Sequence, residues 1–245
     1  MVFAKRSWAS YEAVASREAE VLRLETEVFV TVSRTIMIVG NGPVPERAAP
    51  IIDAADLVIR FNDCRSCGAG GDKTDIVAVC NTGRPALSML GGGGWKNHAA
   101  VRQAAAIWCV RDGGKFQVLR QKLTVTHPDL GDLCDDYTDG FRAFAKATGR
   151  AFHSVPASTH ESVDTALKRF DAGIYVVPSS GLIVIAEVLA HWRQPGDRVV
   201  LAGFGHAGWE WHPFAAERRY VDDLTSKGRL SRLDQTNLSA FAQGA

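Results

Sequence analysis

The sequence lacks a long hydrophobic run. No segment approaches the ~18 consecutive apolar residues of a membrane-spanning helix, and the charged start from Met1 to Trp8 is not followed by the apolar core of a secretion signal. An excess of one charge is also missing, because 28 Lys and Arg residues balance 27 Asp and Glu residues. Nothing therefore draws the whole chain to nucleic acid or anionic lipid. We expect a cytoplasmic protein with no transmembrane segment and no nucleic-acid partner.

The chain also lacks the cysteines of a disulfide framework. Its five cysteines are an odd number and are spread over 71 positions of a 245-residue chain, from Cys64 to Cys134. Cys64 and Cys67 have the spacing of a zinc or redox pair, but a zinc site needs four ligands, usually from two such pairs. Cys80 is badly spaced to complete one. We interpret the pair as structural or incidental.

Length and pattern favour one α/β domain. A chain of 245 residues that is 46% hydrophobic fits one large domain or at most two small ones. Buried strands alternate with helices, which predicts a single-domain, Rossmann-like, doubly wound and mostly parallel sheet. The expected strands are Ile36–Val39, Leu57–Phe61, Asp75–Cys80, Ala105–Val110, Tyr175–Val177 and Arg198–Phe204.

The segments between these strands are expected to be helices and loops. We expect Gly91 to Gly94 to be a flexible loop, and a helix from about Tyr11 to Phe29 to form an N-terminal extension over residues 1–30, followed by a nucleotide-binding domain over residues 31–245. The other expected helices are Ala48–Ala55, Ala99–Ala104, Tyr137–Thr148, Ser162–Phe170, Leu182–His191 and Phe214–Leu224.

A glycine turn follows the first predicted strand. Gly40, Asn41 and Gly42 come directly after four apolar residues. Glycine has no Cβ, so such a turn can present backbone N–H groups to a ligand, and the next helix can aim the positive end of its dipole at the same place. The pattern predicts phosphate or nucleotide binding at the carboxyl end of a parallel sheet.

A second strand-to-helix junction has similar properties. Ser179, Ser180 and Gly181 open a helix that is apolar on nearly all sides and is therefore expected to be buried. A buried helix start leaves N–H donors without partners; a serine can cap some of them, and an anion can accept from the rest. Both junctions could hold one ligand.

One alternative is a protein that binds NAD or NADP. Gly40 and Gly42 follow a strand, and Asp63 stands about 20 residues further on, where a ribose-binding acid is expected. The third glycine of that fingerprint is missing, however, and Pro45 occupies its place.

Several segments together resemble the sialyltransferases of glycosyltransferase families 29 and 42. Val39-Gly-Asn-Gly-Pro43 with Leu57-Val-Ile-Arg-Phe-Asn62 is similar to their long motif, and Pro178-Ser-Ser-Gly-Leu182 with Val200-Leu-Ala-Gly-Phe204 is similar to the small one. His212-Pro-Phe-Ala-Ala-Glu217 matches the very short motif. The resemblance implies a sialyltransferase-like fold and inverting transfer of a sugar acid, sialic acid or Kdo, from a CMP-activated donor to a carbohydrate hydroxyl.

The resemblance also implies roles for individual residues. His212 would be the general base, Glu217 would hold its ring, and His206 would stabilise the leaving phosphate when protonated. The residues expected to bind the nucleotide are Gly40, Asn41, Gly42, Asn62, Asn81, Ser179, Ser180 and Gly181. No Asp-x-Asp pair stands at a strand end, as metal-dependent glycosyltransferases require, so we expect no metal and no cofactor beyond the CMP-sugar donor.

The chain departs from the sialyltransferase pattern in two places. The cysteine pair that links the long and small motifs is absent, and His206 lies only six positions before His212, which shortens the third motif and leaves the acceptor site undefined. From end to end, the chain also resembles bacterial proteins described as urease-operon accessory proteins. A non-catalytic nucleotide-binding accessory protein is therefore the other alternative.

Overall fold

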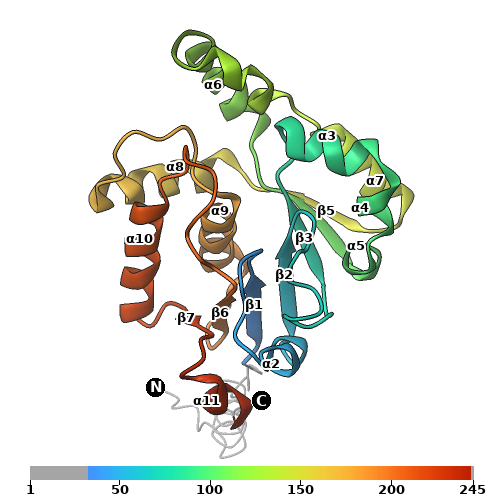
Figure 1. Cartoon of the computed structure of the whole chain (residues 1–245), viewed down its shortest axis with the longest axis vertical. Coiled ribbons are helices and arrows are strands. Elements are labelled where there is room, and N and C mark those ends of the chain that lie inside the picture. The colour runs from blue at the N-terminus through green and yellow to red at the C-terminus, as the bar shows by residue number, and fades with distance from the viewer. Residues whose placement is uncertain (1–32, 244–245) are drawn as a thin grey trace, which may run out of the picture. The chain divides into compact units, whose positions relative to one another are not determined.

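The computed structural model describes residues 33–243, and the helix expected over Tyr11–Phe29 lies outside them. Seven parallel strands form one sheet in the order β5-β4-β3-β2-β1-β6-β7 (Figure 1). They are β1 (Thr35–Val39), β2 (Leu57–Phe61), β3 (Ile76–Val79), β4 (Ala106–Cys109), β5 (Ala151–Ser154), β6 (Arg198–Ala202) and β7 (Ser231–Arg232). The predicted α/β fold with a parallel sheet is confirmed.

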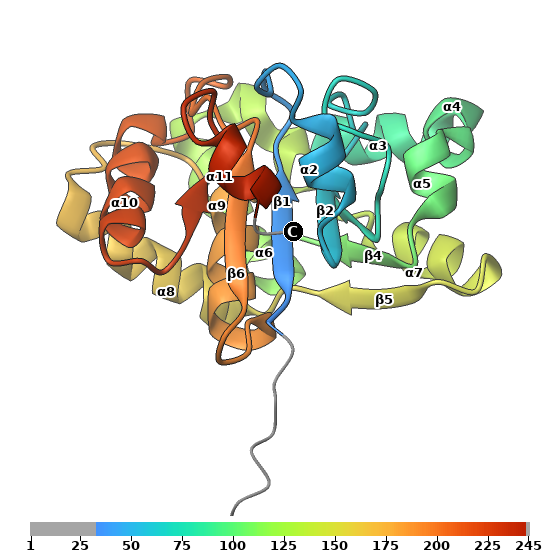
Figure 2. The same cartoon turned by 90° about the horizontal axis from the view of Figure 1, so that it is seen from below.

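Helices cover both faces of the sheet (Figure 2). The α-helices are α2 (Ala49–Asp53), α3 (Gly83–Gly91), α4 (Gly93–Asn97), α5 (Ala99–Gln103), α6 (Gly113–Thr126), α7 (Thr138–Ala147), α8 (Ala157–Leu167), α9 (Ser180–Glu187), α10 (Phe214–Ser226) and α11 (Leu238–Gln243). Two 3₁₀ turns, η1 (Pro128–Cys134) and η2 (Lys168–Phe170), and a π-helical turn, η3 (Val188–Trp192), complete them.

The apolar strands form two cores because alternate side chains point to opposite faces. Ile36 and Ile38 of β1 are buried against the α8, α9 and α10 side, where α9 contributes four buried residues in a row, Leu182–Ile185. Met37 and Val39 of the same strand are buried toward α2 and α11. A further cluster packs α3, α4, α5 and α7 on β3 and β4.

Two expectations for individual segments are wrong. Tyr175–Val177 is not a strand, and β5 and β7 take the two edges of the sheet instead. The expected flexible loop at Gly91 to Gly94 is mostly helical, because α3 ends at Gly91 and α4 begins at Gly93.

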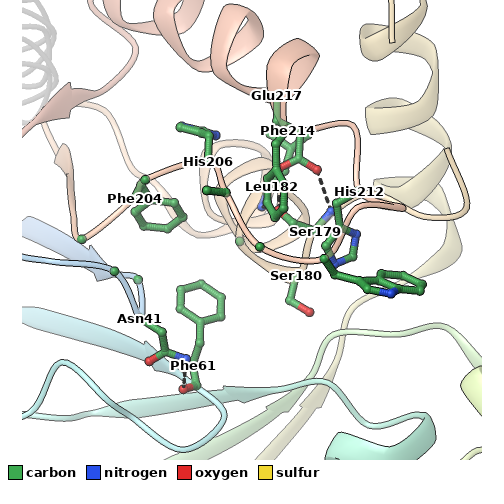
Figure 3. Close-up of a pocket in the computed structure, with 18 of the residues that line it drawn as sticks. Asn41, Phe61, Ser179, Ser180, Leu182, Phe204, His206, His212, Phe214 and Glu217 are labelled. Carbon is green, nitrogen blue, oxygen red and sulfur yellow. Dashed lines mark hydrogen bonds between the residues drawn. The ribbon is translucent and has the colours of Figure 1, made fainter. Parts of the chain in front are cut away.

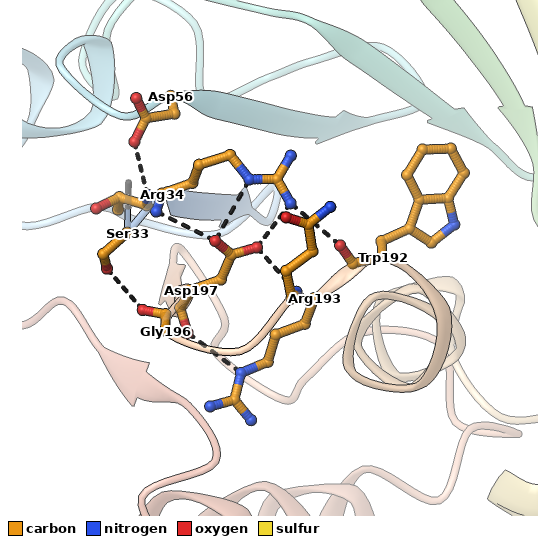
Figure 4. A network of polar contacts seen from close by, with 9 residues as sticks. Ser33, Arg34, Asp56, Trp192, Arg193, Gly196 and Asp197 are labelled. Atoms are coloured by element: carbon orange, nitrogen blue, oxygen red, sulfur yellow. Dashed lines mark hydrogen bonds and ion pairs between the residues drawn. The ribbon is translucent and has the colours of Figure 1, made fainter. Parts of the chain in front are cut away.

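The amino ends of β1 and β6 are joined by an ion pair (Figure 4). The Arg34 Nη2 atom lies 2.6 Å from Oδ2 of Asp197, and the backbone N–H and Nε of Arg34 donate to Oδ1. The backbone N–H of Gln194 donates to Oδ2 as well. Asp197 is 4% exposed, so these contacts satisfy a buried carboxylate.

The order of the strands creates one crevice at the carboxyl ends of the parallel strands, between β1 and β6. The chain moves outward from β1 through β2, β3 and β4 to β5, and then returns to the other side of β1 as β6. The connections from β1 and β6 therefore leave the sheet side by side and in different directions. In open parallel sheets, such a reversal creates a crevice that can receive a ligand.

Candidate functional site

Two turns pack against each other at this reversal. The backbone N–H of Gly40 donates to the Ala202 carbonyl at 2.8 Å, and that of Gly42 donates to the Gly203 carbonyl at 3.0 Å. A Cβ on Gly40 would lie 2.4 Å from the Gly203 oxygen, and Gly203 has φ +69°. The glycines are therefore required for backbone-to-backbone packing. The expectation that the N–H groups of Gly40 and Gly42 face a ligand is wrong.

The Asn41 side chain extends from this turn to the end of β2. Its amide nitrogen donates to the Phe61 carbonyl at 3.1 Å and its oxygen accepts from the Arg65 N–H at 3.0 Å. Asn62, with φ 50°, accepts from the Cys80 N–H at 2.7 Å through its side-chain oxygen. Both amides thus fix the loop that follows β2.

The start of α9 forms the opposite wall. Ser179 is the N-cap, and its hydroxyl oxygen accepts from the Leu182 N–H at 3.2 Å. The Ser179 N–H and hydroxyl donate to the two oxygens of Glu217 at 2.7 and 2.6 Å. Ser180 turns toward the open centre of the pocket (Figure 3).

Glu217 is therefore not bonded to the ring of His212, contrary to what the resemblance implies. Its side chain comes from α10 and is almost fully buried, at 1% exposure. Burial raises its pKa above the ordinary value, although the hydrogen bonds from Ser179 oppose this. Glu217 positions the first residues of α9.

His212 has one ring nitrogen engaged. Nδ1 lies 2.8 Å from the Val177 carbonyl oxygen, which can only accept, so Nδ1 carries a proton. Burial, and next the positive charge of Arg111, lower the pKa of His212 to about 4. At neutral pH the imidazole is therefore neutral, and Nε2 has a lone pair that can accept a proton.

His206 is held in the left-handed region, with φ 47°. Arg232 donates to its Nε2 at 3.1 Å, because a guanidinium has no acceptor atom. Burial and the charges of Arg232 and Arg218 lower its pKa to about 4. In this state His206 is neutral at neutral pH, and not protonated as the leaving-group role implies.

All of these groups line one cavity of about 480 Å³. It contains every residue of the expected site except Asn81, namely Gly40, Asn41, Gly42, Asn62, Ser179, Ser180, Gly181, His206, His212 and Glu217. The two junctions of the sequence therefore converge on one cavity.

Asn81 lies outside the cavity, fully buried behind it. Its amide nitrogen donates to the Arg111 carbonyl at 3.0 Å and to the Thr138 hydroxyl at 2.7 Å. Its oxygen accepts from the Arg111 N–H at 2.7 Å. Asn81 thus positions Arg111 rather than facing the cavity.

Arg111 was not anticipated from the sequence. It stands two positions after the buried end of β4, is 3% exposed, and donates through Nη1 to the Pro178 carbonyl at 2.8 Å. Its Nε has no hydrogen-bond partner among the described residues. A basic residue at a strand end on the carboxyl edge was the one available signal.

Aromatic residues and a further arginine complete the lining. Phe61 and Phe204 meet edge to face with ring centroids 6.0 Å apart, and Trp209 and Phe214 lie beside His212. Arg65 adds a positive charge. Such a lining offers apolar faces that can contact a flat ring and polar groups that can bind a charged group of the same ligand.

Among residues 33–243, no three His, Cys, Asp or Glu side chains gather as a metal site.

No family model matches the sequence. A curated relative does: the urease operon 23 kDa accessory protein of Rhizobium meliloti (strain 1021) is 63% identical over 212 residues, which cover 86% of this chain and 98% of the relative. The chain belongs to the family of this urease operon accessory protein.

Solved structures show which fold this accessory-protein family has. The sialyltransferase CstII of Campylobacter jejuni, in complex with the substrate analogue CMP-3FNeuAc, matches with a TM-score of 0.51 and 12% identity, covering 86% of this chain and 83% of CstII. A mammalian sialyltransferase matches with a TM-score of 0.48 and 17% identity, covering 84% and 71%. The CstII match establishes a sialyltransferase-like fold.

Within residues 33–243, no helix combines the length and apolarity needed to cross a bilayer.

Proposed function

We propose that this accessory-protein family member is a glycosyltransferase that uses a CMP-activated sugar acid as its donor. The observation that carries the proposal is the convergence of the Asn41 turn, the Ser180 helix start and His212 on one cavity. These three elements come from distant parts of the chain, and each was assigned to one ligand on the basis of the sequence alone. The sialyltransferase-like fold supports the same reading.

In this proposal, the donor phosphate lies at the start of α9. The first backbone N–H groups of a helix have no partner within it and favour an anion, and Ser180 and Gly181 line the cavity there. Arg65 lines the cavity, and Arg111, whose charge acts on His212 and whose Nε has no hydrogen-bond partner among the described residues, adds positive potential. As the bond between the anomeric carbon and the phosphate oxygen breaks, negative charge grows where these groups stabilise it.

His212 then acts on the acceptor. Its Nε2 takes the proton from the attacking hydroxyl, while the bond from Nδ1 to Val177 fixes the ring. A pKa of about 4 makes the free imidazole a weak base. The phosphate and carboxylate of the donor bring negative charge beside it, which raises the pKa of a neighbouring imidazole toward neutrality. The same effect allows His206 to gain a proton when the phosphate is bound.

Calorimetry and product analysis test the proposal. We expect CMP and CDP to bind and NAD and NADP not to bind, since the Gly40 and Gly42 N–H groups that a dinucleotide phosphate would need already donate within the protein. We also expect slow release of CMP from CMP-sialic acid or CMP-Kdo, which chromatography can follow. An absence of CMP binding at millimolar concentration would refute the proposal.

The second candidate is a non-catalytic accessory role connected with a urease operon. The observation that favours it is the name of the relative that is 63% identical. This role predicts that the protein binds CMP but cleaves neither CMP-sialic acid nor CMP-Kdo. Substitution of His212 would then change only the affinity for the ligand. The two candidates therefore differ in turnover and not in binding.

A further inference from the structure

The loop after β2 contains two cysteines that have no role in the proposed transfer. Cys64 and Cys67 stand at the ends of a turn in which the Cys67 N–H donates to the Cys64 carbonyl at 3.0 Å. A turn closed by this bond brings the two Cα atoms to less than about 7 Å, a separation that a disulfide can span. The two thiols interact closely enough for each to shift the pKa of the other.

A buried cation lies beside this turn. The Arg60 side chain is fully buried and donates to the hydroxyls of Ser66 and Thr74 and to the carbonyls of Gly70, Gly71 and Lys73. All of these acceptors are neutral, and no carboxylate pairs with Arg60 among the described residues. The Cys67 thiol is a neighbouring group that can become an anion, and the carboxylates of Asp63 and Asp72 also act on the two thiols.

The two thiols have different environments. Cys64 is 1% exposed, whereas Cys67 is partly exposed. The interaction with the neighbouring Cys64 thiol, followed by the charge of Arg60, lowers the pKa of Cys67 to about 7, although partial burial opposes this. The same pairing and its deeper burial raise the pKa of Cys64. An accessible thiolate next to a protected thiol is the arrangement of a nucleophile and its resolving partner.

We propose that Cys64 and Cys67 form a reversible dithiol–disulfide site that reacts with small-molecule or protein disulfides, with Cys67 as the nucleophile. The Cys67 thiolate attacks one sulfur of the incoming disulfide and displaces the other as a thiolate. Cys64 then loses its proton and attacks the Cys67 sulfur, which releases the second thiol. The protein loses two electrons and two protons, and the reagent is reduced to two thiols.

The site is connected to the wall of the cavity. Arg65, between the two cysteines, lines the cavity, and its N–H donates to the Asn41 side chain at 3.0 Å. The Cys64 thiol also contacts the Asn62 carbonyl oxygen at 3.7 Å. Closing the disulfide removes this S–H donor and constrains the turn, so oxidation changes how Asn41 and Arg65 meet.

The chemical test uses the full chain in glutathione redox buffers, quenched with acid, alkylated and digested with trypsin. Cleavage after Arg60, Arg65 and Lys73 separates the cysteines into two peptides, residues 61–65 and 66–73. We expect these peptides to be joined by a disulfide in oxidising buffer and separate in reducing buffer. If no linked pair forms at any ratio, the proposal is wrong.

Single substitutions assign the roles of the two thiols. In the Cys64→Ala variant we expect a stable glutathione adduct on Cys67, and in the Cys67→Ala variant no adduct on Cys64. Cys134→Ala is the matched control, because Cys134 lies in a different cluster and its loss leaves the linked pair unchanged. Adducts on Cys64 alone would overturn the assignment of the nucleophile. Alkylation of Cys67 with a midpoint near pH 8.5 or above would do so as well.

The effect of oxidation on the cavity wall is measured separately by NMR. This measurement needs no ligand, so its result does not depend on the proposed function. In ¹⁵N-labelled protein, we expect oxidation to shift the Arg65 backbone amide and the Asn41 side-chain amide signals. The buried Asn81 side-chain amide, which bonds to Arg111 and Thr138, is the internal control. A linked peptide pair with unchanged Asn41 and Arg65 signals would show a thiol site with no effect on the cavity, and would refute this part.

Discussion

At the scale of single residues, three side chains hold the short segment that precedes α9. His212 bonds to the Val177 carbonyl, Arg111 to the Pro178 carbonyl, and Glu217 to the N–H and hydroxyl of Ser179. Arg111 follows β4, whereas His212 and Glu217 lie just before and within the first turn of α10, yet together they engage three consecutive residues. The position of the α9 start is therefore fixed by contacts distant in sequence. Loss of one of these contacts would displace both His212, the proposed base, and the N–H groups of α9 that are proposed to bind the phosphate.

The role of His212 is tested by His212→Asn. An asparagine amide can keep the hydrogen bond to the Val177 carbonyl but has nothing in place of Nε2. We expect CMP release from the donor to fall by about 10²–10⁴-fold, with CMP affinity changed less than about threefold. Chromatographic rates and calorimetry measure the two effects. Equal rates for the asparagine variant and the unmodified protein would remove His212 from the chemistry.

The positioning role of Glu217 predicts a loss of stability. Glu217→Ala leaves the partly buried Ser179 N–H and hydroxyl without their acceptor, and each orphaned group costs about 1–3 kcal/mol. We expect the free energy of unfolding in urea to fall by about 2–5 kcal/mol. Ser180→Ala is the control, since it removes only a hydroxyl that faces the cavity; we expect a change below about 0.5 kcal/mol. Similar losses for both variants would contradict this role.

Much of the residue-level site follows from sequence, and part of it does not. Asn41, Ser180 and His212 belong to short motifs next to glycines or strand ends, so their chemistry is visible locally. The acceptor of the Ser179 hydroxyl is 38 positions away in Glu217, and Arg111 reaches Pro178 across 67 positions. No local pattern encodes such pairings, which is why Glu217 was assigned to the wrong partner and Arg111 was missed.

At the scale of elements, burial decides which segments can be predicted. The central strands β1 to β4 and β6 are almost entirely buried, and their apolar runs predicted them to within one or two residues. Strand β5 is an edge strand with no fully buried residue, and β7 has only two residues. Tyr175–Val177 looks like a strand, but its Val176 N–H donates to the Trp211 carbonyl in a loop.

The contact between the two glycine turns predicts the effect of Gly40→Ala. The new methyl group would lie 2.4 Å from the backbone oxygen of Gly203, which cannot rotate away. We expect a loss of about 1–3 kcal/mol or more in unfolding free energy, together with weaker CMP binding. Gly205→Ala is the matched control on the facing turn, because its Cβ would meet no atom within 4 Å. An equal effect of both would show that the turns do not pack as described.

At the scale of the whole molecule, one buried and two partly buried histidines set the response to acid. Burial is the main cause that lowers the pKa of His160, His206 and His212 to about 4, whereas an unfolded histidine titrates near 6.5. The unfolded chain therefore binds more protons between these two values, and stability falls as pH falls through this range. For His160 alone, which is 3% exposed, this corresponds to about 3 kcal/mol.

Urea unfolding at a series of pH values tests this expectation. We expect the free energy of unfolding to be highest near pH 7 and to decrease from about pH 6.5 to pH 4. The raised pKa of Glu217 acts in the opposite sense, but it is one group against three. Asp197, whose pKa the Arg34 ion pair lowers, loses its contribution only below about pH 3.8. A flat profile between pH 7 and pH 4.5 would contradict the burial of the histidines.

The position of β1 between β2 and β6 has a consequence for how the chain is made. On the ribosome, β1 emerges early and gains β2 as a neighbour within about 20 residues, but its other edge has to wait until Arg198–Ala202 is synthesised. Throughout that interval the nascent chain carries an apolar strand with one open edge, which is a template for pairing with other chains. A chaperone that binds nascent chains would therefore be expected to bind the open edge of β1.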